Sequence, residues 1–148
     1  MDHKIGVIPF SFDGDDIALM FVTSLKRGRW ILPKGNLKAN EEHQAGCERE
    51  AFEEAGVRGE FLKDFPITTA ISKSTNSGLT KVVVTYYPML VTEQADEWPE
   101  VSKRERHWAL IKDAYRVADR EDFRQLIEQF EAISPAVIDI ARRKMPQL

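Results

Sequence analysis

The stretch that most constrains this chain lies between residues 35 and 57 and reads GNLKANEEHQAGCEREAFEEAGV. Within it, Glu50, Glu53 and Glu54 are spaced i, i+3 and i+4, so on a helix their side chains project from one face. Like charges at this spacing repel and cost an exposed helix about a few tenths of a kcal/mol per pair. We therefore expect a cation among them, and a hard divalent ion with oxygen ligands, Mg²⁺ above all, fits that chemistry.

The other residues of this stretch predict how the helix is anchored and where it ends. Asn40 can cap its start, and Gly56 can take the left-handed conformation that closes a helix. Gly46 lies within the carboxylate arc, where we expect it to leave open space for a substrate. The opposite arc should pack on a core through apolar side chains: Ala45, Ala51, Phe52 and Ala55.

The stretch resembles the Nudix box, the signature of hydrolases acting on nucleoside diphosphates linked to other moieties. The family pattern is G-x5-E-x7-R-E-U-x-E-E-x-G-U, where U is apolar. It is matched in register by Gly35, Glu41, Arg49, Glu50, Ala51, Glu53, Glu54, Gly56 and Val57. The resemblance implies an α/β/α sandwich with a mixed β-sheet between helices. It also implies hydrolysis of phosphoanhydride bonds with Mg²⁺ as cofactor, for which Mn²⁺ can substitute.

The resemblance assigns roles within the box. Glu50 and Glu54 are expected to bind the metal, with the carbonyl of Gly35 as a further ligand. Glu53 is expected to act as the general base that takes a proton from the attacking water, although a ligand role for it is a serious rival. Two further residues are expected to orient the carboxylates without touching the substrate: Arg49 and Glu41.

Outside the box, residues 29–35 (RWILPKG), 98–100 (WPE) and 104–108 (RERHW) resemble the diphosphoinositol polyphosphate phosphohydrolase subgroup. Substrates of that kind, or diadenosine polyphosphates, carry phosphates beyond the scissile pair and require cations outside the metal site. Lys34, directly before the metal-binding loop, is the first candidate. The full set of expected substrate-binding residues is Lys34, Arg29, Lys4, Arg104 and Arg106.

Two alternatives stay open at this point. One is a pyrophosphatase for nucleoside diphosphates such as ADP-ribose or a nucleotide sugar, or for nucleoside triphosphates. Such an enzyme would use aromatic side chains for base stacking, and the candidates are Trp30, Tyr86, Tyr87 and Trp98. Strand alternation places some of these in the core, so we expect little base selectivity. The other alternative is a catalytically silent Nudix-like binding domain, which has no physical need for three mutually repelling glutamates.

Composition narrows the remaining possibilities. A chain of 148 residues suits a single domain over residues 1–148, and its net charge of −3 offers no basic field for nucleic acid or an anionic membrane. One cysteine, Cys47, excludes an internal disulfide and suits the cytoplasm, where we expect it to be a packed thiol. We expect no signal peptide or membrane span, a small-molecule partner, and a monomer or homodimer. The three histidines have no triad spacing: His3, His43 and His107.

Apolar and β-branched runs predict most of the strands. Turn residues at 13–16 and 76–78 separate strand pairs, and Pro88 suggests a bulge or an edge in the longest strand. The polar residues 93–106 are expected to form a loop over the site. The predicted strands are residues 5–12, 17–23, 30–32, 57–65, 67–73, 81–92 and 107–111. Two amphipathic helices are predicted at the end, over residues 123–130 and after a cap at Ser134-Pro135.

Overall fold

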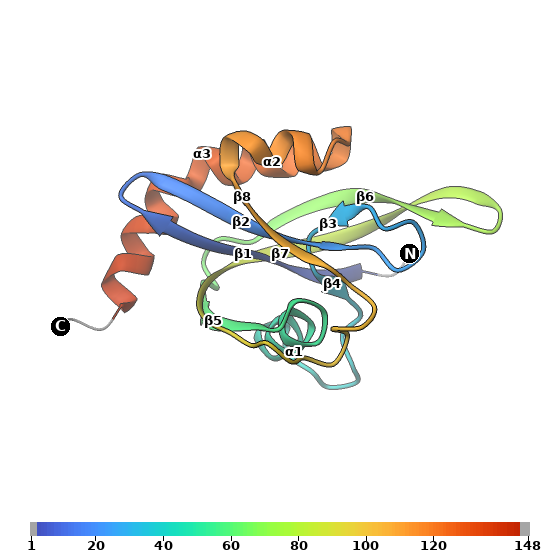
Figure 1. Ribbon diagram of the computed structural model, residues 1–148, viewed down its shortest axis with the longest axis horizontal. Coiled ribbons are helices and arrows are strands. Elements are labelled where there is room, and N and C mark those ends of the chain that lie inside the picture. Colours follow the sequence, from blue (N-terminus) through green and yellow to red (C-terminus); the bar gives the residue numbers. More distant parts are fainter. Residues whose placement is uncertain (1–2, 146–148) are drawn as a thin grey trace.

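In the computed structural model, which describes residues 3–145, a mixed β-sheet separates helix α1 from helices α2 and α3 (Figure 1). The strands are β1 (His3–Asp13), β2 (Asp16–Thr23), β3 (Trp30–Ile31), β4 (Lys34–Gly35), β5 (Val57–Phe61), β6 (Ile67–Thr75), β7 (Gly78–Gln94) and β8 (Arg106–Leu110). The helices are α1 (His43–Ala55), α2 (Ile111–Val117) and α3 (Glu121–Lys144). The arrangement confirms the expected mixed sheet between helices.

The sheet is built around β1 and β7, which pair in parallel from His3↔Val83 to Phe10↔Leu90. Residues 5–10 of β1 are all buried, as expected for a strand covered on both faces. β2 pairs antiparallel with β1, and β3 and β8 pair with β2. β5 and β6 pair antiparallel with successive parts of β7.

Pro88 lies in the central strand β7 at the point where the neighbouring strand changes. β6 pairs with β7 as far as Tyr86, and β5 pairs with the part of β7 from Met89 to Gln94. The backbone N–H of Leu62 donates to the carbonyl of Pro88 on this side. The N–H that Pro88 lacks therefore falls in the gap between two strands, so no ladder hydrogen bond is lost. The register shift of β5 occurs elsewhere, between Arg58 and Gly59.

The prediction of two C-terminal helices is wrong, because α3 is continuous through Pro135. Proline removes the backbone donor to the carbonyl four residues earlier, which is that of Glu131. The hydroxyl of Ser134 donates to this carbonyl at 2.7 Å and replaces the lost bond. The buried stripe also continues across the proline, from Phe123 to Ala141. The short helix α2 was not predicted.

Helix α1 differs from expectation at its start and on its buried side. It begins at His43, and Asn40 lies before it with φ 62° instead of capping it. Ala45 is exposed, and α1 buries Glu50 and Glu54 together with its small residues. Gly56 ends the helix in the left-handed conformation, as predicted. Within residues 3–145, no helix is long and apolar enough to cross a membrane.

Candidate active site

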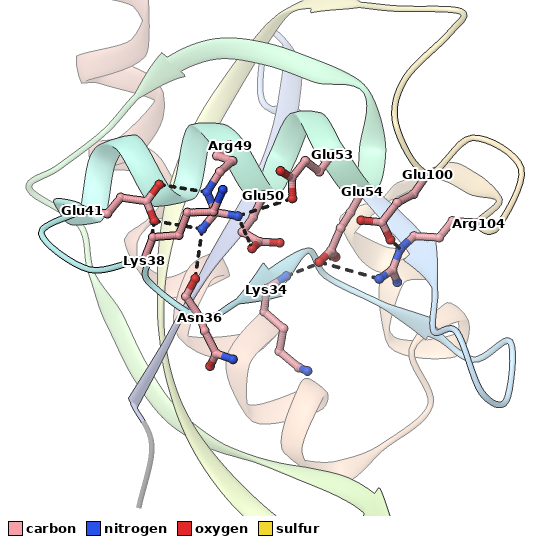
Figure 2. A network of polar contacts seen from close by, with 10 residues as sticks. All are labelled: Lys34, Asn36, Lys38, Glu41, Arg49, Glu50, Glu53, Glu54, Glu100 and Arg104. Atoms are coloured by element: carbon pink, nitrogen blue, oxygen red, sulfur yellow. Dashed lines mark hydrogen bonds and ion pairs between the residues drawn. The ribbon is translucent and has the colours of Figure 1, made fainter.

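The three glutamates of α1 do not converge on one point. Glu50 and Glu54 are 8% and 4% exposed and lie on the side of α1 that faces the sheet, whereas Glu53 lies higher on the helix beside Arg49 (Figure 2). No group of three or more acidic, histidine or cysteine side chains within residues 3–145 is close enough to hold a metal. The shared face predicted from spacing is therefore divided into a buried pair and a half-exposed third carboxylate.

The loop that begins with β4 meets this buried pair. β4 pairs with β1 through Ile5↔Gly35, which holds the loop beneath α1. A Cβ atom added at Gly35 would meet the carboxyl group of Glu50, with Oε2 at 2.7 Å and the other carboxyl atoms closer still. The backbone N–H of Lys34 points to Glu54 Oε1 at 3.4 Å. Gly35 is thus the residue whose missing side chain makes room for the Glu50 carboxylate.

Burial dominates the electrostatics of Glu54. It raises the pKa of Glu54 to about 9, while Arg104 acts in the opposite direction and a hydrogen bond and charge repulsion from Glu50 add to the rise. Arg104 Nη2 lies 3.7 Å from Glu54 Oε2. Without a metal ion, the Glu54 carboxyl group therefore favours its protonated form, because Arg104 does not offset the effect of burial on its pKa.

Arg49 and Glu41 form the contact that orients the other end of the helix face. Arg49 Nε and Nη2 donate to the two oxygens of Glu41 at 2.8 and 2.9 Å, and Nη1 donates to Glu50 Oε1 at 2.7 Å. Nη1 also lies 3.4 Å from Glu53 Oε2, and Nη2 donates to the carbonyl of Asn36. The Arg49 bond is the main reason that the pKa of Glu41 falls to about 2. One guanidinium therefore connects three carboxylates and the loop.

These residues fit a magnesium ion. Mg²⁺ in proteins is commonly held by one or two carboxylates together with water and substrate phosphates. Glu50 and Glu54 provide two adjacent carboxylates, and the absence of a side chain at Gly35 lets the Glu50 carboxylate lie against the loop. Glu53, bonded to Arg49 and with a side chain 35% exposed, is outside this pair.

The predictions for Gly46 and Cys47 have different outcomes. The prediction that Gly46 leaves open space is wrong, because a Cβ there would lie 2.6 Å from Leu37 Cδ2 and 3.1 Å from Glu41 Oε1. The space is filled by protein.

Cys47 is a packed thiol as expected. It is fully buried, and its Sγ lies 3.4 Å from the carbonyl oxygen of Gly6. Burial raises the pKa of this thiol to about 12.

A cavity of about 650 Å³ opens beside Glu54. Its walls come from the loop after β2, from the hairpin of β6 and β7, and from the start of α3. Three acidic side chains line it: Glu54, Glu121 and Asp122. Eight cationic side chains line it: Lys26, Arg27, Arg29, Lys34, Lys73, Lys81, Arg104 and Arg120. In a chain of net charge −3, this is a strong local excess of positive charge.

The structure brings only some of the predicted substrate-binding residues to this cavity. Lys34 and Arg29 line it, and burial, with the charge of Lys4 second, lowers the pKa of Lys34. Lys4 does not line the cavity. Arg104 does, but it bonds to Glu100 and to the carbonyl of Thr23 as well as facing Glu54.

Arg106 is also outside the cavity, because it stacks on Trp98 and donates to the carbonyl of Ala55. The cavity cations that sequence reasoning missed are Lys26, Arg27, Lys73, Lys81 and Arg120. The one available signal was the position of Lys73 and Lys81 on either side of the predicted turn at 76–78.

The candidate stacking aromatics and the histidines are mostly engaged elsewhere. Tyr86 is fully buried, and Trp98 is covered by Arg106. The side chains of His3 and His43 hydrogen-bond to Thr85 and Tyr87 respectively. The ring of His107 lies 5.6 Å from that of Trp30.

Comparison with known proteins gives one family throughout. The family model described as NUDIX domain matches residues 3–130. Nudix hydrolase 12, mitochondrial, of Arabidopsis thaliana is 29% identical over 119 residues, which are 77% of this chain and 58% of the relative. Diphosphoinositol polyphosphate phosphohydrolase 3-beta of Bos taurus is 29% identical over 110 residues, covering 73% of this chain and 63% of the relative.

The fold has solved counterparts. A crystal structure of a C. elegans Ap4A hydrolase binary complex aligns with a TM-score of 0.71 at 18% identity, covering 92% of this chain and 99% of that chain. The chain spans about three fifths of the length of the curated relatives it matches.

Proposed function

The chain belongs to the NUDIX domain family, and on this premise we propose that it hydrolyses phosphoanhydride bonds in small, highly phosphorylated substrates, with Mg²⁺ as its cofactor. Diphosphoinositol polyphosphates and diadenosine polyphosphates are the substrate classes that we favour. The observation that carries the proposal is the cation-lined cavity that opens directly beside Glu54.

The charge of the cavity supports a substrate with several phosphates. Eight cationic and three acidic side chains line the cavity. This excess of positive charge is larger than a single pyrophosphate group needs. The sheet and the loops hold these cations around one volume, so phosphates beyond the scissile pair can each meet a Lys or Arg side chain. Lys34 is the cation closest in sequence to the loop at Gly35, and it connects the cavity to the carboxylate pair.

Glu50, Glu54 and the carbonyl of Gly35 would hold the metal. Bound there, Mg²⁺ supplies positive charge to the phosphate oxygens as the anhydride bond breaks. Arg49 fixes the Glu50 carboxylate through a 2.7 Å bond, and Arg104 faces the Glu54 carboxylate. Arg49 orients its ligand without needing to contact the substrate, whereas Arg104 both faces Glu54 and lines the cavity.

Glu53 is our choice for the general base. Its side chain is partly exposed and separate from the buried pair, so it can accept a proton from water. Arg49 Nη1 at 3.4 Å keeps its carboxylate oriented. A ligand role for Glu53 would require its side chain to leave Arg49 and turn toward Glu50.

A nucleotide-linked polyphosphate is favoured by a second observation. Leu25 and Leu79 are 59% and 77% exposed, and both line the cavity. Leu25 follows β2 and Leu79 lies near the turn between β6 and β7, so the two enter the cavity wall from different segments. An apolar edge beside a cationic cavity suits a dinucleoside polyphosphate, whose bases can lie against the leucines, better than an inositol pyrophosphate, which is polar throughout.

The test compares an inositol pyrophosphate, a diadenosine polyphosphate and a nucleotide sugar. Catalytic efficiency is measured for the wild type, for Arg29→Ala with Lys34→Ala, and for a control that removes two exposed lysines outside the cavity, Lys63→Ala with Lys112→Ala. We expect the first double variant to lose most on the most highly phosphorylated substrate and the control to match the wild type. A uniform loss across substrates, or a wild type that prefers the nucleotide sugar, would contradict the proposal.

A further inference from the structure

Residues 95–106, which we call the strap, run from the end of β7 to the first residue of β8 and lie against the C-terminal end of α1. This end of α1 carries Glu53 and Glu54. One strap side chain, Arg104, faces the carboxylate pair: its Nη2 lies 3.7 Å from Glu54 Oε2. Further contacts of the strap are with the backbone that carries these two glutamates.

The last carbonyls of a helix have no partner within the helix. The strap supplies partners for three consecutive carbonyls of α1 and for that of the residue after it. Glu100 N–H donates to the carbonyl of Glu53 at 3.1 Å, Trp98 Nε1 to that of Glu54 at 3.1 Å, Arg106 Nη1 to that of Ala55 at 2.9 Å and Ala95 N–H to that of Gly56 at 2.8 Å.

The strap is ordered by its own contacts. The N–H groups of Lys103 and Arg104 donate to the carbonyl of Glu100, which closes a turn. The guanidinium of Arg106 lies 4.0 Å from the centre of the Trp98 ring. Gly56 makes room for this stack, since a Cβ there would lie 2.8 Å from Trp98 Cδ2. These contacts fix the orientation of the Trp98 indole independently of its hydrogen bond to α1.

The strap also brings charge that α1 lacks. The C-terminal end of a helix carries partial negative charge, and carboxylates there are unfavourable. The last turn of α1 has no basic residue of its own. Arg104 and Arg106 supply two cations from the strap, and Arg104 is bonded to Glu100 at 2.9 Å while it faces Glu54.

From these contacts we propose that Trp98 is a positioning residue of the metal site. Its indole N–H fixes the peptide that follows Glu54 and holds the last turn of α1 at the depth where Glu54 meets Glu50 and the loop at Gly35. The inference rests on the proposed metal site. It concerns how the site is kept in shape, and it places no atom of Trp98 on the metal or the substrate.

The test replaces Trp98 by phenylalanine, which keeps an aromatic ring beside Arg106 and removes the N–H that reaches Glu54. Binding of Mn²⁺ to the substrate-free protein is followed by the loss of the free ion's electron paramagnetic resonance signal. We expect Trp98→Phe to raise the Mn²⁺ dissociation constant roughly tenfold, as removal of an orienting partner does in metal sites.

Two control variants separate positioning from general effects. Trp108→Phe removes an equivalent indole N–H, whose partner is Gln94 Oε1 in an exposed bond that includes no atom of α1. Ile127→Val lowers stability by trimming the buried side of α3, across the sheet from α1. Both should bind Mn²⁺ as the wild type does, and thermal unfolding is measured for all variants.

The outcomes distinguish the two proposals. A wild type that binds no Mn²⁺ overturns the metal site and this inference together. A wild type that binds Mn²⁺ while Trp98→Phe binds it equally well overturns the positioning role and leaves the proposed function standing. Equal weakening in Trp98→Phe and Ile127→Val overturns the positioning role as well, because affinity would then follow stability alone.

Discussion

Replacing Gly35 by alanine tests the geometry of the proposed metal site with a single methyl group. Gly35 does not have the positive φ seen at other glycines of the chain, so alanine is compatible with its backbone. The new Cβ would lie 2.7 Å from Glu50 Oε2 and closer to the rest of that carboxyl group, whereas ordinary contacts begin at 3.4 Å. The Glu50 carboxylate must therefore retreat by roughly 1 Å, a displacement that can cost about 10²-fold in rate.

The assay measures both metal dependence and stability. We expect Gly35→Ala to reduce turnover about 10²-fold at saturating substrate and to raise the Mg²⁺ concentration needed for half of its own maximal activity. The melting temperature should change little, because the displaced group is a buried carboxylate that gains no new partner and leaves no cavity. Gly14→Ala, at a turn between β1 and β2 with φ 62°, should lower the melting temperature through backbone strain while leaving the Mg²⁺ titration unchanged, so it separates a stability effect from a site effect.

Two results would refute this reasoning. Wild-type turnover and an unchanged Mg²⁺ titration in Gly35→Ala would show that Glu50 can move without consequence and is not a ligand. A loss of activity that is matched by a large fall in melting temperature would show that the clash disrupts the packing of α1 and not the metal site alone.

Two further predictions follow from the acidic residues of α1. Glu53→Gln should lower kcat by roughly 10²-fold or more while leaving Mn²⁺ binding unchanged, because it removes basicity and keeps shape; a weaker Mn²⁺ affinity would instead make Glu53 a ligand. Burial raises the pKa of Glu54 to about 9 from 4.5, so the folded, metal-free protein retains a proton that the unfolded chain releases. The raised pKa of Glu54 should therefore increase the free energy of unfolding by its full amount below pH 4.5. This stabilisation should disappear as the pH rises to about 9. Urea unfolding at several pH values should show this slope in the wild type but not in Glu54→Gln.

The local features of the site were accessible from sequence because they depend on residues close together in the chain. The i, i+3 and i+4 spacing placed the glutamates on α1, and Gly56 ends the helix as its left-handed φ requires. The spacing could not show that α1 turns Glu50 and Glu54 toward the sheet. That orientation depends on the fit of Cys47, Ala51 and Ala55 against the core.

The features that the sequence did not predict depend on residues that are far apart in the chain. Leu37 fills the space beside Gly46, and nothing near Gly46 indicates that contact. Five cavity cations come from three segments that only the sheet topology brings together. Ser134-Pro135 predicts a helix start because this pair is a common cap, but in the structure Ser134 supplies the missing donor inside a continuous helix.

The hairpin of β6 and β7 carries Leu79, a residue that lines the cavity, near its exposed tip. Residues 75–80 at its tip are exposed, and the backbone pairing from Ser74↔Leu79 to Ile67↔Tyr86 holds them over the cavity. Substitutions at Leu79 can therefore alter what the cavity accepts without touching α1, Gly35 or the core. Mutations at this tip can therefore change substrate preference during evolution, while the residues proposed for catalysis, on α1 and at Gly35, remain under separate selection.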